Sequence, residues 1–168
     1  SWTCVARCTS HTRGVAHRDV KPANVMVGSF GEVYLVDWGI AVAVSGDAPP
    51  GLPRAADTRE IVGTVAYMAP EMAFPGGAVD ARTDVFLVGA VLHALIAGAP
   101  PWRKGTTEQA LYAAFRCERA SFAADVPDEL AALCGRAMAK DPGARFATAD
   151  EVRLALERFS AHAAARAL

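Results

Sequence analysis

The stretch HRDVKPAN, residues 17–24, places five polar or charged side chains within eight positions. Pro22 lies among them and opposes the interior of a helix, so the stretch is predicted to be a short irregular loop. Three of its residues have complementary chemical uses. Asp19 offers a carboxylate that can take a proton, Lys21 offers a charge for a phosphoryl group, and Asn24 offers an amide oxygen for a hard cation.

Two short β-branched runs follow this loop and predict a β-hairpin. They are NVMV (24–27) and EVYLVD (32–37), and the glycine-bearing sequence GSFG separates them. Asp37 ends the second run, so the hairpin would return it beside Asn24, and Gly39 permits a sharp turn after it. Phosphoryl transfer from a nucleotide requires a carboxylate that takes the hydroxyl proton and oxygen ligands for magnesium ions. The loop and the hairpin together would supply both.

The spacing of apolar residues along the rest of the chain changes at Pro70. From Asp37 to Ala69 the periodicity is weak, and SGDAPPGLPRAAD (45–57) is predicted to be a loop from its glycine and proline content. Beyond Pro70 the spacing of apolar residues predicts helices. One would end near Ala97 with Thr83 or Asp84 as its cap, and three would cover 106–118, 127–140 and 148–159, the last with a capping box of Thr148 and Glu151. No internal repeat and no second domain is expected.

Composition and net charge indicate one globular domain and argue against some classes of binding partner. The 168 residues suffice for one domain, and 52% apolar with 21% charged residues can build a core. The 17 basic and 18 acidic residues give a net charge of -1, which argues against a nucleic-acid partner or a membrane surface. The uncharged stretch 85–102 is predicted to be a buried core helix and not a membrane segment, because its helical part falls short of the roughly 30 Å hydrocarbon core.

The four cysteines are scattered, and no zinc-site spacing connects them: Cys4, Cys8, Cys117 and Cys134. They are predicted to be free thiols, as in a reducing cytoplasm. His11 and His93 also lack a metal partner and are expected to pack inside the fold or to lie at its surface. The chain opens on Ser1-Trp2 without a signal-peptide pattern, so a cytoplasmic location is expected, although a parent protein could be membrane-anchored outside this segment.

A resemblance to protein kinases rests on three short motifs that occur in order. HRDVKPAN resembles the catalytic loop of that family, DWG (37–39) its magnesium-binding triplet, and APE (69–71) the end of its activation segment. Trp38 stands where the triplet usually has phenylalanine, another large aromatic residue. Three longer stretches resemble the lower, helical lobe of the family: GTVAYMAPE (63–71), DVFLVGAVLHALIAGAPPW (84–102) and KDPGARF (140–146).

The resemblance covers residues 11–160 and implies a bacterial serine/threonine kinase type. The implied fold is mainly α: a kinase C-terminal lobe with a small β-hairpin that carries the catalytic and magnesium loops. Residues 1–168 would form a partial kinase domain. Its catalytic loop would lie at 17–24, its activation segment at 37–71 and its helical lobe at 72–160.

The resemblance also implies roles for residues near the loop. Asp19 would be the catalytic base, Lys21 would contact the phosphate, and Asn24 and Asp37 would hold magnesium. Met26 would form an apolar floor under adenine. The implied cofactors are ATP and Mg2+, and the implied partner is a protein substrate with a serine or threonine acceptor.

Regulation and substrate choice would involve further residues. Arg18 would bind a phosphorylated activation-loop residue, for which Thr58 is the first candidate and Ser45 the weaker one. Thr64, in the substrate loop, and Lys21 favour serine/threonine substrates, because tyrosine-specific relatives usually lack a lysine at this loop position.

Four polar residues are expected to have structural roles. His17 would hold the catalytic loop by hydrogen bonds and would not act as a base. Glu71 and Arg145 would pair across the lobe and would not remain separate surface charges. Asp84 would brace the backbone of the catalytic loop, in addition to any capping role.

The upstream elements of a kinase do not occur in this sequence. It has no glycine-rich phosphate loop, no lysine on an upstream strand and no helix glutamate to pair with it. In WTCVARCTS (2–10), Arg7 and Thr9 stand where the helix that leads to the catalytic loop should carry large apolar residues. We therefore expect a fragment of a longer kinase, or a gene that lost its front half, without the N-terminal β lobe. Two functions stay open: a serine/threonine kinase whose other lobe lies outside this sequence, and a non-catalytic remnant or pseudokinase that binds proteins.

Overall fold

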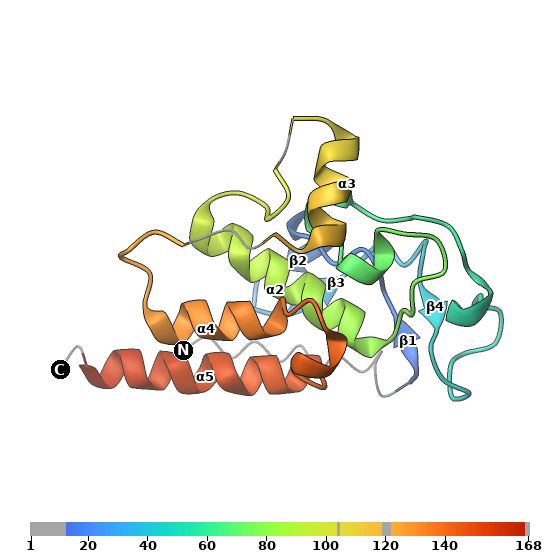
Figure 1. Ribbon diagram of the computed structural model, residues 1–168. Coiled ribbons are helices and arrows are strands. Elements are labelled where there is room, and N and C mark those ends of the chain that lie inside the picture. The colour runs from blue at the N-terminus through green and yellow to red at the C-terminus, as the bar shows by residue number, and fades with distance from the viewer. Residues whose placement is uncertain (1–12, 104, 119–121, 167–168) are drawn as a thin grey trace.

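The computed structural model describes residues 13–103, 105–118 and 122–166. Within them, four α-helices dominate (Figure 1): α2 (Ala81–Ala97), α3 (Thr107–Arg116), α4 (Asp128–Ala137) and α5 (Ala149–Arg166). Four short strands accompany them: β1 (Val15–Ala16), β2 (Val25–Val27), β3 (Val33–Leu35) and β4 (Val42–Ala43). The strands form two separate sheets, β1 with β4 and β2 with β3. The prediction of a mainly α fold with a small hairpin is confirmed for these residues.

α2 lies at the centre of the helices, with α3 on one side and α4 and α5 on the other (Figure 1). The predicted core stretch 85–102, which includes most of α2, contributes Val85, Phe86, Leu87, Ala90 and Trp102 to the core, whereas Leu95 is 75% exposed. The Phe86 and Trp102 rings stack with centroids 6.3 Å apart, and the Trp102 indole N–H donates to the carbonyl oxygen of Met68 at 2.8 Å. Within the described ranges, no helix has both the length and the hydrophobicity that crossing a membrane requires.

The start of α2 differs from the prediction. Asp80 has an extended backbone (φ -140°) and is the N-cap, and the Thr83 hydroxyl accepts a hydrogen bond from its N–H at 3.2 Å. Thr83 and Asp84 therefore lie inside the first turn and neither is the N-cap, although Thr83 completes a capping box with Asp80. The end of the helix at Ala97 is confirmed, because Gly98 takes a left-handed conformation (φ 69°) that stops the helix.

α3 begins where the sequence predicts. The Thr106 hydroxyl accepts a hydrogen bond from the N–H of Gln109 at 3.2 Å, and the Gln109 side-chain oxygen accepts one from the N–H of Thr106 at 3.1 Å. α4 begins at Asp128, directly after Pro127, and ends at Ala137, before the predicted boundary.

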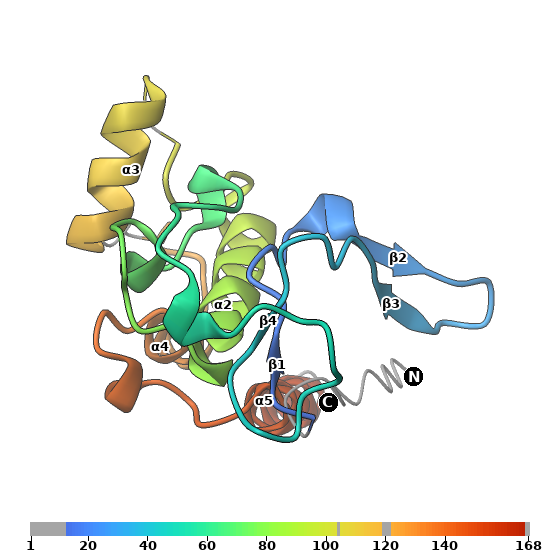
Figure 2. The same cartoon turned by 90° about the vertical axis from the view of Figure 1, so that its right-hand side faces the viewer.

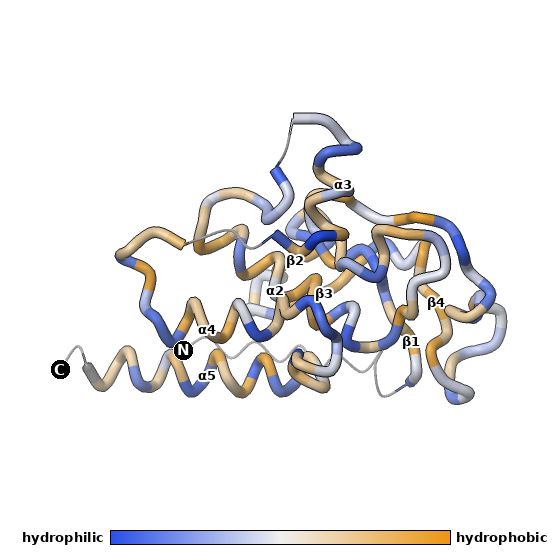
Figure 3. The backbone as a smooth tube through the Cα atoms, in the orientation of Figure 1, coloured by the Kyte–Doolittle hydropathy of each residue, from blue (hydrophilic) through white to orange (hydrophobic). Residues whose placement is uncertain are grey.

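The N-cap of α5 is Thr148, whose hydroxyl accepts a hydrogen bond from the N–H of Glu151 at 3.2 Å. In a regular capping box the Glu151 carboxylate would accept from the N–H of Thr148. Here it accepts instead from the N–H of Ala147, one residue earlier, at 3.0 Å. The helix continues to Arg166, beyond the predicted end at Phe159, since alanine-rich sequence follows. Hydrophobic and hydrophilic residues alternate along α5 (Figure 3), and its apolar side joins a buried cluster with α2 and α4.

β2 and β3 form the predicted hairpin, with Val25 opposite Leu35 and Met26 opposite Tyr34. The hairpin projects away from the helices (Figure 2). Several of its large apolar side chains are exposed: Met26, Val27, Phe30 and Tyr34. The described residues therefore leave this element uncovered.

The pairing of β1 with β4 was not predicted. Val15 lies opposite Ala43 and Ala16 opposite Val42 in an antiparallel pair. Each strand has only two residues, which is too short for an alternating pattern to be visible. The pair joins the chain just before the loop 17–24 to the segment after the hairpin.

Cys117 and Cys134 are free thiols, as predicted, and burial raises the pKa of Cys134 to about 12. His93 packs inside the fold, where its Nδ1–H donates to the carbonyl oxygen of Ala99 at 3.2 Å. The other predictions for cysteines, histidines and the opening helix fall on residues outside the described ranges: Cys4, Arg7, Cys8, Thr9 and His11.

Candidate active site

Asp84, from α2, holds the backbone at the start of the catalytic loop. Its two carboxylate oxygens accept hydrogen bonds from consecutive N–H groups, that of His17 at 2.8 Å and that of Arg18 at 2.9 Å. Arg18 has a left-handed backbone (φ 67°), which is strained for a residue with a side chain. The two hydrogen bonds stabilise this turn, and the turn orients the next residue, Asp19.

His17 is fully buried and joins the catalytic loop to the end of the hairpin. Its Nε2–H donates to the carbonyl oxygen of Val36 at 3.1 Å, and its Nδ1 accepts from the N–H of Asp19 at 3.2 Å. The Trp38 ring meets the imidazole edge-on, with centroids 4.5 Å apart, and the Trp38 indole N–H donates to the carbonyl oxygen of Leu35 at 2.9 Å. Both ring nitrogens of His17 are thus used to hold backbone.

The Asp19 carboxylate is the centre of a compact polar cluster. Lys21 Nζ donates to Asp19 Oδ2 at 2.7 Å and to the Thr64 hydroxyl oxygen at 2.7 Å. The Thr64 hydroxyl and backbone N–H donate to Asp19 Oδ1 at 2.7 and 3.0 Å. Asn24 Nδ2 donates to Asp19 Oδ2 at 3.1 Å and to the Asp19 backbone carbonyl at 2.9 Å.

These contacts determine the charge of Asp19. Burial raises the pKa of a carboxyl group, but hydrogen bonds from Lys21, Thr64 and Asn24, together with the positive charge of Lys21, outweigh it and lower the pKa of Asp19 below its usual value. The carboxylate is therefore ionised at neutral pH and can accept a proton.

Asn24 and Asp37 come from two segments that the structure places side by side. The N–H of Val36 donates to the backbone carbonyl of Asn24 at 2.9 Å, which joins the end of β3 to the catalytic loop. Asn24 is buried, whereas Asp37 is exposed and has a left-handed backbone (φ 63°). Met26, two residues after Asn24, is 58% exposed on β2. Asn24 and Asp37 thus lie at the two ends of the hairpin, and Met26 lies on its first strand.

Arg18 and Thr58 border the same small cavity, together with Glu60. Arg18 Nε donates to the carbonyl oxygen of Ile40 at 2.7 Å, and the Thr58 hydroxyl donates to a backbone carbonyl in its own segment at 2.9 Å. Burial lowers the pKa of the Arg18 guanidinium, and nearby carboxylates, Glu60 among them, oppose this effect. The structure places Arg18 and Thr58 near each other, and each side chain already donates a hydrogen bond to a backbone carbonyl.

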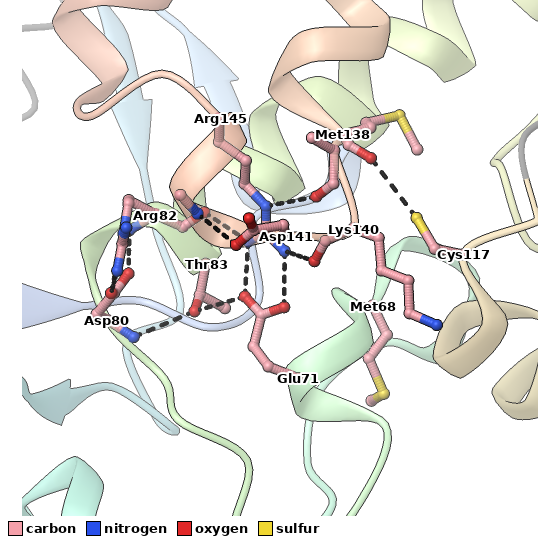
Figure 4. A network of polar contacts seen from close by, with 12 residues as sticks. Met68, Glu71, Asp80, Arg82, Thr83, Cys117, Met138, Lys140, Asp141 and Arg145 are labelled. Atoms are coloured by element: carbon pink, nitrogen blue, oxygen red, sulfur yellow. Dashed lines mark hydrogen bonds and ion pairs between the residues drawn. The ribbon is translucent and has the colours of Figure 1, made fainter.

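Glu71 and Arg145 form the expected ion pair, which lies inside the helical part (Figure 4). Arg145 Nη1 donates to Glu71 Oε1 at 2.7 Å, and Nη2 donates to Glu71 Oε2 at 2.8 Å. The remaining N–H groups of Arg145 donate to the backbone carbonyls of Arg82, Ala139 and Lys140 at 2.9, 2.8 and 3.2 Å. All five guanidinium donors are therefore satisfied.

Three participants at these sites were missed by sequence reasoning. The Thr83 hydroxyl donates to Glu71 Oε1 at 2.9 Å (Figure 4). Thr64 was expected in the substrate loop, but its direct bond to Asp19 was not. A Cβ at Gly77 would lie 1.7 Å from the carbonyl oxygen of Glu71, so that glycine is required there. The doubled glycine at 76–77 was the one visible signal of this close approach.

The sequence model of the protein kinase domain matches residues 5–155. The chain is 38% identical over 158 residues to the serine/threonine-protein kinase PknB of Mycolicibacterium smegmatis, a match that covers 92% of this chain and 24% of that protein. It is 36% identical over 151 residues to a probable serine/threonine-protein kinase of Streptomyces coelicolor, covering 88% of this chain and 22% of that protein.

A third relative, a probable serine/threonine-protein kinase of Corynebacterium efficiens, is 36% identical over 171 residues, with 98% of this chain and 25% of that protein covered. The chain thus spans about a quarter of the length of the curated relatives that it matches. Because the family model matches most of the chain and the motif residues form one connected cluster, the chain belongs to the protein kinase domain family, of the bacterial serine/threonine kinase type.

Proposed function

We propose that this chain carries the phosphoryl-transfer site of a serine/threonine protein kinase, with ATP as phosphate donor. The observation that carries the proposal is the Asp19 carboxylate, which Lys21 and Thr64 hold in place and keep ionised. Asp19 would accept the proton of a substrate hydroxyl. A carboxylate with a lowered pKa is a weak base, but phosphoryl transfer depends on positioning and charge more than on base strength.

The Thr64 hydroxyl indicates how a substrate hydroxyl could be held. It donates to Asp19 Oδ1 and accepts from Lys21 Nζ, both at 2.7 Å. A serine or threonine hydroxyl next to this cluster could make the same pair of contacts. Lys21 would then steady the negative charge of the transferred phosphoryl group, because its ammonium group can reach from Asp19 toward an incoming oxygen.

The donors at the root of the hairpin fit magnesium. The amide nitrogen of Asn24 is occupied by Asp19, so the amide oxygen is the atom available to a cation. The Asp37 carboxylate, on the neighbouring segment, is the second oxygen donor, and both are ligand types that Mg2+ prefers. Bound there, magnesium would neutralise phosphate charge. Asn24 and Asp37 would position it, and the hydrogen bond from Val36 to Asn24 would hold the two ligands together.

We further propose that the exposed face of the hairpin receives a nucleotide-binding lobe from outside this sequence. Met26 is 58% exposed, and Val27, Phe30 and Tyr34 are exposed on the same element. Met26 would then form the apolar floor under adenine. An element with this much uncovered apolar surface is unusual on a domain that works alone.

The same exposed hairpin keeps the alternative function open, in which the chain is a non-catalytic module that binds proteins. The test uses radiolabelled magnesium-ATP with two proteins: the 168-residue chain, and a longer protein in which a nucleotide-binding lobe precedes it. We expect no label transfer from the chain alone and clear transfer from the longer protein. Asp19→Ala should abolish that transfer, and Asp125→Ala, which changes an exposed aspartate elsewhere, should not. A longer protein that binds partners but transfers no label would favour the binding module.

A further inference from the structure

A cavity of about 430 Å³ lies between the segment after the magnesium triplet and the loop 76–79. Cavities of about 300–1,000 Å³ are typical of sites for small ligands. None of the proposed catalytic residues borders it. Ala43, Ala55 and Val79 give it apolar walls, and Arg54 and Arg59 bring positive charge. The cavity is therefore separate from the proposed phosphoryl-transfer site, and its lining is both apolar and positively charged.

The guanidinium groups of these two arginines have no hydrogen bond or ion pair with any residue in the described ranges. This distinguishes them from Arg145, whose five donors are all used, and from Arg153, which pairs with two carboxylates of its own helix. A Cβ at Gly76 would lie 3.6 Å from Nη1 of Arg59, so the guanidinium group of Arg59 lies against the wall that the loop 76–79 forms. The charge of Arg59 thus lies at the cavity wall, and Arg54 is a second lining residue.

No carboxylate borders the cavity to neutralise this charge. Asp57 and Glu60 belong to the same segment as the arginines, but neither is among its lining residues, and the charge of Glu60 acts on Arg18. The cavity therefore has a net positive character that the described residues leave unbalanced.

Hydroxyl groups complete the lining. The Thr58 hydroxyl already donates its hydrogen to a backbone carbonyl at 2.9 Å, so it can only accept. The Ser45 hydroxyl accepts a hydrogen bond from the N–H of Asp47 at 3.3 Å, which leaves its own hydrogen to donate. Among the side chains of the lining residues, Ser45 and the two arginines are therefore the ones with hydrogens left to donate.

We infer that this cavity binds a phosphomonoester, with its phosphate group on Arg54, Arg59 and Ser45. Two guanidinium groups supply up to ten N–H donors in planar forks that match phosphate oxygens. The cavity is larger than one phosphate group requires, and its alanine and valine walls suit a short apolar body such as the side chain of phosphothreonine. A bound ligand would join the segment 43–59 to the loop 76–79.

This site is independent of the proposed phosphoryl transfer, and its test needs no activity. Amide NMR spectra of the 168-residue chain are recorded during titration with O-phosphothreonine, with inorganic phosphate and with threonine. We expect O-phosphothreonine to shift signals of Ala43, Ala55 and Val79 in a saturable way, inorganic phosphate to bind more weakly, and threonine to have no effect. A response to inorganic phosphate as strong as to O-phosphothreonine would contradict a site for the whole phosphomonoester.

Substitutions then test the assigned donors. Arg54→Ala and Arg59→Ala should each weaken O-phosphothreonine binding by about ten- to a hundredfold, as expected for the loss of charge-assisted hydrogen bonds. The matched control Arg158→Ala, which removes an exposed arginine of α5, should leave the affinity unchanged. Both sites are exposed, and circular dichroism would verify that each variant keeps its helices. Equal binding by all three variants would overturn the inference.

The source of the phosphomonoester is distinguished by two further probes. A five-residue peptide centred on phosphothreonine represents a protein side chain, and glycerol 3-phosphate represents a small metabolite. Tighter binding of the peptide would assign the site to phosphorylated proteins, and tighter binding of glycerol 3-phosphate would assign it to metabolites. Saturable binding of neither would overturn the proposal.

Discussion

Two carboxylate–cation pairs in this domain have the same contact distance, but their cations differ in exposure. Lys21 Nζ lies 2.7 Å from Asp19 Oδ2, and Arg145 Nη1 lies 2.7 Å from Glu71 Oε1. The side chains of Lys21 and Asp19 remain 22% and 11% exposed, whereas those of Arg145 and Glu71 are 0% and 9% exposed. The two carboxylates are thus almost equally covered, and the pairs differ in the cation: Lys21 is partly exposed, whereas Arg145 is fully buried inside the helical part.

The two pairs differ in whether the cation can leave its carboxylate and bind another group. Lysine is a point charge on a flexible stem, so Lys21 can leave Asp19 for an incoming oxygen while Asp19 accepts a new hydrogen bond. Arginine is a rigid planar donor, and Arg145 has already used each of its five N–H groups. The first pair is suited to chemistry because it can open, and the second is suited to structure because it cannot open without leaving a buried charge.

The largest effect should come from removing the base without changing its shape. In a protein that includes the nucleotide-binding lobe, Asp19→Asn should lower turnover by about 10²–10⁴-fold, the usual cost of losing a positioned proton acceptor. The free energy of unfolding should fall by about 1–3 kcal/mol, because an amide cannot accept all the hydrogen bonds that the buried carboxylate accepts. Label transfer and urea unfolding measure the two quantities. Full activity in this variant would remove Asp19 from the proposed chemistry.

The opposite pattern is expected at the buried pair. Arg145→Ala should lower the free energy of unfolding by about 3–5 kcal/mol, because the Glu71 carboxylate would remain buried without its partner. The matched control is Arg153→Ala, which removes the exposed pairs with Asp150 and Glu157 and should cost much less, because water screens these charges. Urea unfolding of the 168-residue chain gives both values. Equal losses for the two variants would show that the buried pair behaves like a surface pair.

A smaller loss should follow from removing the hydroxyl that supports Glu71. Thr83→Val keeps the shape of the side chain but takes one donor from Glu71 and leaves the N–H of Asp80 without its capping partner. The expected cost is about 1–3 kcal/mol in the free energy of unfolding. Thr83→Ser retains the hydroxyl and should recover most of it. If Thr83→Val leaves the free energy of unfolding unchanged, the hydroxyl does not support Glu71.

Sequence reasoning succeeded where the deciding residues are close together in the chain. The catalytic loop groups Asp19, Lys21 and Asn24 within a few positions, and local capping residues such as Thr106 and Thr148 define helix starts. The family resemblance, and not any local pattern, supplied the pairing of Glu71 with Arg145, which are 74 residues apart.

The failures have a shared physical cause. β1 and β4 have two residues each, so they exist because the surrounding chain packs them together and not because of their own propensity. The Thr64 hydroxyl donates to Asp19, which lies 45 residues earlier in the chain. No local sequence pattern predicts a contact over that separation. At the start of α2, Asp80, Thr83 and Asp84 are all capable caps by residue type, and tertiary contacts decide among them: Thr83 bonds Glu71 and Asp84 bonds the catalytic loop, which leaves Asp80 as the cap.

The smallest predicted effect concerns the titration of Asp19. Its pKa is lowered in the folded chain, so it should titrate below about 3.9, the value of an unperturbed aspartate. A lowered folded pKa contributes stability that is present above pH of about 3.9 and is lost as the pH falls through the folded value. Lys21→Met should raise the pKa of Asp19 by removing a hydrogen bond and a charge. Thr64→Val should raise it less, because that change removes a hydrogen bond only and leaves the backbone N–H in place. Carboxyl carbon NMR of the aspartates follows both shifts, and a midpoint that neither substitution moves would mean that Lys21 and Thr64 do not hold the charge of Asp19 in solution.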